Sequence, residues 1–141
     1  MKNLITKDFV KVVILSAVYS VIINVILLAL VKGPSGAPLD FGPFMYQAVV
    51  GATVLGVILA GVTYILISKY NKNLLSNWTV ISLIVLMLSF IPDVLLPYST
   101  AVEDQGSTPF IILMLMIMHV APAWIVIVKF NKYQKSLELQ N

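Results

Sequence analysis

Two ionisable residues, Asp93 and His119, lie inside long apolar stretches of the sequence and are the strongest candidates for chemistry. On insertion scales, an ionised Asp near the centre of a membrane-spanning helix costs about 2.5–3.5 kcal/mol. A carboxylate at such a position therefore needs a partner or a function. His119 is the one histidine of the chain, and an imidazole can bind and release a proton near neutral pH.

Two neutral polar residues, Asn24 and Gln47, fall at similar depths in two other apolar stretches. At about 1.5 Å of rise per residue, Asp93 lies about 6 Å and His119 about 15 Å below the outer surface, so the axial gap between them is about 9 Å. We hypothesise that these four residues form a polar pocket in the outer half of the protein. A direct contact between Asp93 and His119 would require a tilted or unwound helix.

A purely structural interpretation of the same residues is also open. Asn and Gln side chains often join membrane helices by hydrogen bonds worth roughly 0.6 kcal/mol per pair. Asp93 follows Pro92, and Pro122 follows His119 by three positions. Because proline interrupts helical hydrogen bonding, Asp93 would then cap a broken helix and His119 would bond a carbonyl group that Pro122 leaves free.

The composition argues against several classes of function. The chain has no cysteine, which excludes disulfides, thiolate metal sites and cysteine nucleophiles. One histidine and one distant aspartate do not make a metal coordination shell. We therefore expect no metal, no cofactor and no catalytic residues, and an enzyme is the least favoured reading because nucleophile and cofactor motifs are missing.

The elements that must position the candidate residues are four apolar runs. Each has about 20 residues, enough to cross about 30 Å of bilayer hydrocarbon as a helix. Only 11% of the 141 residues are charged, against about 25% in a soluble domain. The sequence thus predicts an all-α, antiparallel four-helix transmembrane bundle that forms a single membrane domain over residues 1–141, with spans at 12–31, 44–68, 78–97 and 109–128.

The lysines are distributed unevenly between the two sides of this predicted bundle. Both tails and the second loop carry all of them except Lys32, which shares the other side with Asp40, Glu103 and Asp104. The positive-inside rule then places both termini in the cytoplasm. We expect a multi-pass protein of the cell membrane, in a bacterial plasma membrane, with lipid as its surroundings and no nucleic-acid partner, since its lysines flank apolar runs and it has no arginine.

The second run carries a small residue at every fourth position, namely Ala48, Ala52, Gly56 and Ala60. Rows of this kind let helix backbones approach closely. We expect the row to be a packing face, either within the bundle or toward a second copy or another membrane protein.

The segments Phe90-Ile-Pro-Asp-Val-Leu-Leu-Pro97 and Met116-Ile-Met-His-Val-Ala121 resemble a bacterial family of small four-span membrane proteins of unassigned function. The resemblance implies the four-helix fold over nearly the whole chain and singles out Asp93 and His119. It implies no activity.

Two functional hypotheses follow from different classes. In the first, the protein binds or transports a small solute or ion through the polar pocket, where Asp93 exchanges a proton or pairs with a cation. In the second, it is a structural or accessory subunit that docks a membrane partner through the small-residue face of its second helix.

Overall fold

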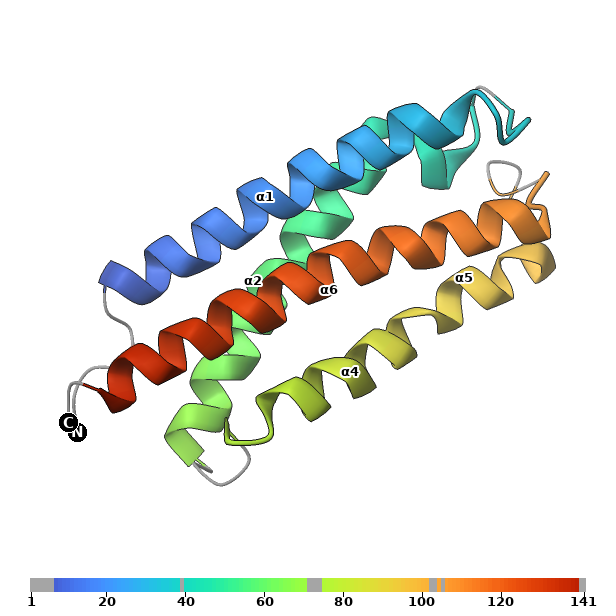
Figure 1. Cartoon of the computed structure of the whole chain (residues 1–141). Coiled ribbons are helices and arrows are strands. Elements are labelled where there is room, and N and C mark those ends of the chain that lie inside the picture. The colour runs from blue at the N-terminus through green and yellow to red at the C-terminus, as the bar shows by residue number, and fades with distance from the viewer. Residues whose placement is uncertain (1–6, 39, 71–74, 102–103, 105, 140–141) are drawn as a thin grey trace.

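The computed structural model describes residues 7–38, 40–70, 75–101, 104 and 106–139, and every regular element in this part of the chain is helical. Four segments are long and apolar enough to cross a membrane. The predicted all-α four-helix fold is confirmed, and the protein is a multi-pass membrane protein (Figure 1). The elements are α1 (Lys7–Lys32), η1 (Gly42–Phe44), α2 (Tyr46–Tyr70), α4 (Trp78–Ser89), α5 (Ile91–Leu95), η2 (Leu96–Tyr98) and α6 (Pro109–Glu138).

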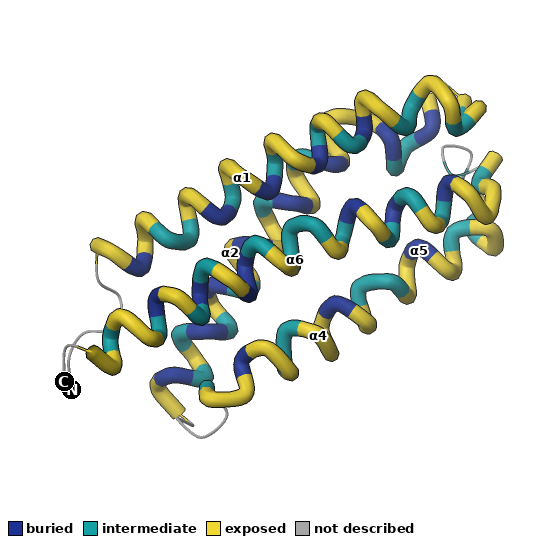
Figure 2. The backbone as a smooth tube through the Cα atoms, in the orientation of Figure 1, coloured by how far each residue is buried: buried dark blue, intermediate teal, exposed yellow. Residues whose placement is uncertain are grey.

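The outer surface of the helices is apolar along most of their length. Large aliphatic side chains such as Leu30, Leu55 and Leu88 are more than half exposed, whereas the buried positions form narrow stripes that face the neighbouring helices (Figure 2). In water this surface would be unfavourable by about 25 cal/mol for each Å². Lipid tails therefore complete the solvation of this fold.

The helix ends differ from the predicted spans. α1 and α6 continue beyond 12–31 and 109–128 into segments that contain lysines, with α6 reaching Glu138. Hydropathy marks only the lipid-facing part of a helix, whereas Lys, Gln, Leu and Glu support helix in water as well. α2 starts at Tyr46, after Pro43 has formed part of the short helix η1.

The third span is interrupted in its outer half. α4 ends at Ser89, and α5 begins at Ile91 with Pro92 in its first turn. Pro92 has no N–H to donate to the carbonyl oxygen four residues back. This leaves the Leu88 carbonyl oxygen without its usual helical donor, and close by the hydroxyl of Ser89 donates to the Leu86 carbonyl oxygen at 2.7 Å. The break places Asp93 in the first turn of a new, short helix.

The four spans do not form a closed ring. α1 packs along both α2 and α6, and α4 packs along α6, whereas α2 and α4 have little contact with each other. In Figure 1 the outer ends of α2 and α5 lie on opposite sides of α6. α1 lies close to α2 at Gly61, where an added Cβ would lie 3.1 Å from Cγ2 of Val13.

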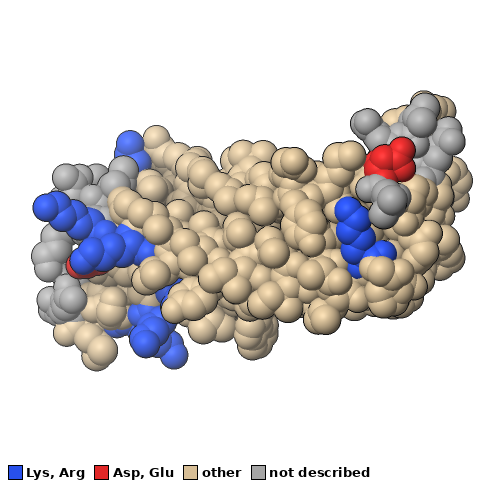
Figure 3. Space-filling view, turned by 90° about the horizontal axis from the view of Figure 1, so that it is seen from above, with Lys and Arg blue, Asp and Glu red and all other residues tan. Residues whose placement is uncertain are grey.

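Aromatic side chains from all four spans pack together at the end of the bundle where α1 begins and α6 ends. This inner aromatic cluster consists of Phe9, Tyr64, Trp78, Phe130 and Tyr133. Its rings stack or meet edge to face at centroid distances of 5.2–6.4 Å, as in the stacked pairs Phe9–Tyr64 and Trp78–Phe130. The same end carries the concentration of lysines (Figure 3).

A second apolar cluster covers the opposite end. This outer cluster joins α1, the first outer loop and the starts of α2 and α6, and it includes the fully buried residues Leu28, Phe41, Phe44 and Ile111. Thr108 caps α6 by accepting a hydrogen bond from the Ile111 N–H at 3.3 Å. The two clusters leave the middle of the bundle as the place where a cavity can form.

Candidate functional site

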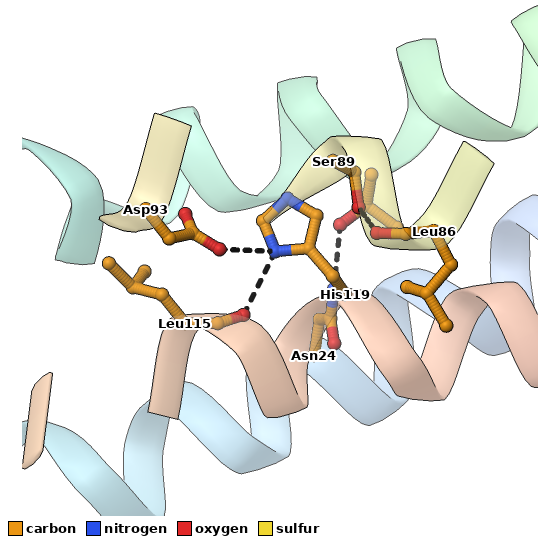
Figure 4. A network of polar contacts seen from close by, with 7 residues as sticks. Asn24, Leu86, Ser89, Asp93, Leu115 and His119 are labelled. Carbon is orange, nitrogen blue, oxygen red and sulfur yellow. Dashed lines mark hydrogen bonds and ion pairs between the residues drawn. The ribbon is translucent and has the colours of Figure 1, made fainter. Parts of the chain in front are cut away.

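The structure brings Asp93 of α5 and His119 of α6 into direct contact. Oδ2 of Asp93 lies 3.2 Å from Nδ1 of His119 (Figure 4). Asp93 is 8% exposed, whereas the side chain of His119 is 38% exposed. The two ionisable groups that the sequence singled out therefore form one pair within the membrane-spanning part of the bundle.

The sequence placed the two residues about 9 Å apart along the bundle axis and predicted that a direct contact would require a tilted or unwound helix. The third span is interrupted at Phe90, between α4 and α5, and the directions of the two side chains also favour the contact. Every Cα–Cβ bond in a helix tilts toward the N-terminus of that helix. α5 and α6 run in opposite directions, so Asp93 leans inward and His119 leans outward. The two side chains converge along the bundle axis, and the break at Phe90 adds further freedom on the Asp93 side.

The surroundings of His119 determine which ring nitrogen carries hydrogen. Nδ1 lies 2.9 Å from the carbonyl oxygen of Leu115, one turn earlier in α6, as well as beside Asp93. Both neighbours accept hydrogen bonds in this arrangement, so we assign the hydrogen to Nδ1. Nε2 points away from both acceptors (Figure 4) and is the nitrogen that remains available to another molecule.

Asn24 contributes a second polar group from α1. Its Nδ2 donates a hydrogen bond to Oγ1 of Thr53 in α2 at 2.9 Å, and that hydroxyl donates onward to the Val49 carbonyl oxygen at 2.7 Å. The amide oxygen Oδ1 of Asn24 is buried without a hydrogen-bond partner among the described residues. Asn24 therefore joins α1 to α2 through its nitrogen and keeps its acceptor oxygen unused.

Gln47 does not join the pocket, in contrast to the hypothesis. It is exposed in the first turn of α2 and is not among the residues that line the cavity described below. Its depth suited the pocket, but successive helix residues point about 100° apart, and Ala48 instead occupies the inward direction. Depth from hydropathy carries no information about this angle.

A cavity of about 510 Å³ lies between α2 and α4 and extends to α6. Asp93, His119 and Asn24 are on its wall. The small-residue row of α2 forms the opposite wall, and Gly56 faces open space, since an added Cβ would meet nothing within 4 Å. Within one chain, the row thus borders a cavity, while the neighbouring stripe of α2 that includes Gly61 packs against α1.

Further polar groups, which the sequence did not identify as pocket residues, also line the cavity. Ser82 and Ser89 line the cavity with Asp93, and their spacing in the sequence places all three on one helical face. Trp78 at the inner end gave no such signal, because aromatic residues commonly mark a membrane interface. Trp78 Nε1 and Ser82 Oγ are buried without hydrogen-bond partners in the described part of the chain.

The described residues contain no group of three or more His, Cys, Asp or Glu side chains that could hold a metal ion. The site offers hydrogen bonding and one carboxylate–imidazole pair on a largely apolar wall. Ligand pockets commonly have this composition and a volume of about 300–1,000 Å³.

These features define a class: a four-span membrane protein with a cavity inside the bundle and an ionisable pair on its wall. The chain belongs to a family of unknown function, DUF6069, whose family model matches residues 6–136. Comparisons with curated proteins and with solved structures find no match.

Proposed function

We propose that the protein binds, or carries across the membrane, a small solute held in the cavity between α2, α4 and α6. The observation that carries the proposal is the contact of Asp93 with His119 at 3.2 Å on the cavity wall. A carboxylate in lipid is costly, and a merely structural aspartate would be expected to have its oxygens fully hydrogen-bonded. Here Oδ2 lies 3.2 Å from the His119 ring but has no hydrogen-bond partner among the described residues.

The size of the cavity supports the same proposal. Protein interiors are close-packed, with few voids larger than a water molecule. A volume of about 510 Å³ on the open side between α2 and α4 leaves wall atoms without protein neighbours, so a molecule from the bilayer can gain van der Waals contacts by filling the space. A solute with an apolar body and a polar end would match both the apolar part of the wall and the Asp93–His119 pair.

Mass spectrometry of discs cut directly from the expressing membrane with a copolymer tests this proposal, because no detergent then strips the cavity. We expect a small molecule to be extracted with the wild-type protein and to be strongly depleted in Asp93→Asn and His119→Ala. Asp40→Asn is the matched control, since it removes an exposed carboxylate outside the cavity. Equal recovery from all variants, or no bound small molecule in wild-type discs, would contradict the proposal.

A second candidate is docking of a membrane partner or a second copy on the small-residue row. The observation in its favour is that Ala48, Ala52 and Gly56 are all exposed in the single chain. The same row borders the cavity whose wall also carries Asp93 and His119, and a docked helix gives no reason for that ionisable pair. This is why we place solute binding first.

A further inference from the structure

We propose that the occupant is a single-chain amphiphilic organic cation that enters from within the bilayer, with its ammonium group at Asp93 and its chain along α2. This inference rests on the proposed function and specifies the chemical class of the solute. Three features of the structure support it: the route into the cavity, the charge of its wall and its shape.

The route is lateral because both ends of the bundle are closed. The inner aromatic cluster takes at least one ring from each span, and Phe130 in its middle is fully buried. The outer cluster closes the other end with Phe41 and Phe44, against which Leu96 of η2 also packs. The remaining side lies between α2 and α4, where the helices have little contact. That side faces lipid, so the occupant must dissolve in the bilayer.

The charge of the wall favours a cation. Among the described residues, Asp93 is the one acidic side chain that lines the cavity, and no lysine lines it. When Asp93 is ionised, its carboxylate is the negative charge of this wall. An alkylammonium supplies both N–H donors and the charge that compensates a carboxylate.

The shape favours one extended chain. The cavity wall runs from Asp93 to Trp78 along α5 and α4, a distance of about 20 Å at helical rise. A cavity of this length suits an extended hydrocarbon chain, whose far end would then lie near Trp78. The small side chains of Ala52 and Gly56 keep the cavity open, and larger ones would fill it.

Trp78 provides a built-in reporter for the experiment. It is 3% exposed and lies at the inner end of the cavity, whereas Trp124 is 67% exposed on the lipid-facing surface. In Trp124→Phe, fluorescence comes from Trp78 alone; in Trp78→Phe, it comes from Trp124 and measures how much probe enters the bilayer. The probes are three alkyl chains of equal length with bromine at the far end, ending in an ammonium, a hydroxyl or a carboxylate, added to discs of zwitterionic lipid.

We expect the ammonium probe to quench Trp78 saturably, at a concentration in the bilayer at least about tenfold lower than the hydroxyl probe needs. Asp93→Asn should abolish this preference, and Asp40→Asn should preserve it. Gly56→Leu should prevent saturable quenching of Trp78 by any probe, while quenching of Trp124 stays unchanged.

Other outcomes would overturn the inference in distinguishable ways. Saturable quenching by all three probes with equal affinity would refute the preference for a cation but leave solute binding in the cavity intact. If Trp124 were quenched and Trp78 were not, lateral entry would be refuted. Solute binding itself would then be decided by the extraction of a small molecule from native discs, an experiment that uses no added probe.

Discussion

One nitrogen of His119 faces two oxygen acceptors, and this arrangement makes the two members of the pair unequal. Removing the imidazole leaves the buried Asp93 carboxylate without its polar neighbour at 3.2 Å, at a cost of about 1–3 kcal/mol. Asp93→Asn keeps an acceptor oxygen beside Nδ1. We therefore expect His119→Ala to lower the free energy of unfolding by about 1–3 kcal/mol and Asp93→Asn by less than about 1 kcal/mol.

Chemical unfolding of both variants and of the double variant in lipid discs measures this difference. The double variant should be more stable than the sum of the single effects implies, because Asn at position 93 no longer leaves a charge behind when the imidazole is gone. Equal effects of the two single substitutions, or strict additivity, would show that the pair does not interact as the geometry indicates.

At the residue scale, the sequence indicated which residues belong to the site but not where their side chains point. Asp93, His119 and Asn24 stood out because polar groups in lipid are costly, and all three line the cavity. Their contacts could not be predicted, since the lean of the side chains and the rotation of each helix decide them. Gln47 was predicted to line the pocket and does not, because the rotation of α2 turns it away from the cavity. Thr53, the partner of Asn24, gave no signal because a threonine hydroxyl in a helix commonly bonds its own backbone.

At the scale of elements, α2 presents two glycines to different surroundings. Gly61 is buried against Val13 of α1, with 3.1 Å to an added Cβ, whereas Gly56 faces the cavity. Gly61→Leu should therefore force α1 and α2 apart and lower the free energy of unfolding by about 1–3 kcal/mol. Gly56→Leu should leave stability unchanged or raise it by up to about 1 kcal/mol, because leucine is the better helix former.

The same pair of variants, compared by unfolding in lipid discs and by native mass spectrometry, also tests docking on the small-residue row. If the small-residue row were an intersubunit face, Gly56→Leu would dissociate the oligomer. Folded Gly61→Leu protein would still form it, because Gly61 lies outside the row. An unchanged subunit number in Gly56→Leu would count against docking. A greater loss of stability at Gly56 than at Gly61 would contradict the position of the cavity.

The spans were predictable as elements because length and apolarity alone specify a membrane helix. The interruption at Phe90 was foreshadowed by Pro92, yet Pro122 lies within an unbroken α6. A proline therefore marks where a helix can break, and the packing of its neighbours decides whether it does. The helical end of α6 beyond residue 128 is polar and could not be recognised from hydropathy.

At the scale of the whole molecule, the arrangement of lysines predicts the orientation in the membrane. α1 begins and α6 ends at the lysine-rich end of the bundle (Figure 3). We expect reporter tags on both termini to be cytoplasmic, because positively charged segments are retained on that side. Protease protection and tag-specific labelling in intact cells measure this, with Lys32→Glu as a control that should not change the orientation. Tags on opposite faces of the membrane would refute it.

The inner aromatic cluster has a mechanical consequence. It fastens all four spans together at one end, while α2 and α5 diverge toward the other. Because Trp78 belongs to this cluster and Asp93 lies about 20 Å away along α4 and α5, a rotation of the third span about Trp78 would displace Asp93 farther than it displaces the cluster. Such a rotation would widen or narrow the lipid-facing side of the cavity between α2 and α4 while the aromatic rings stay packed.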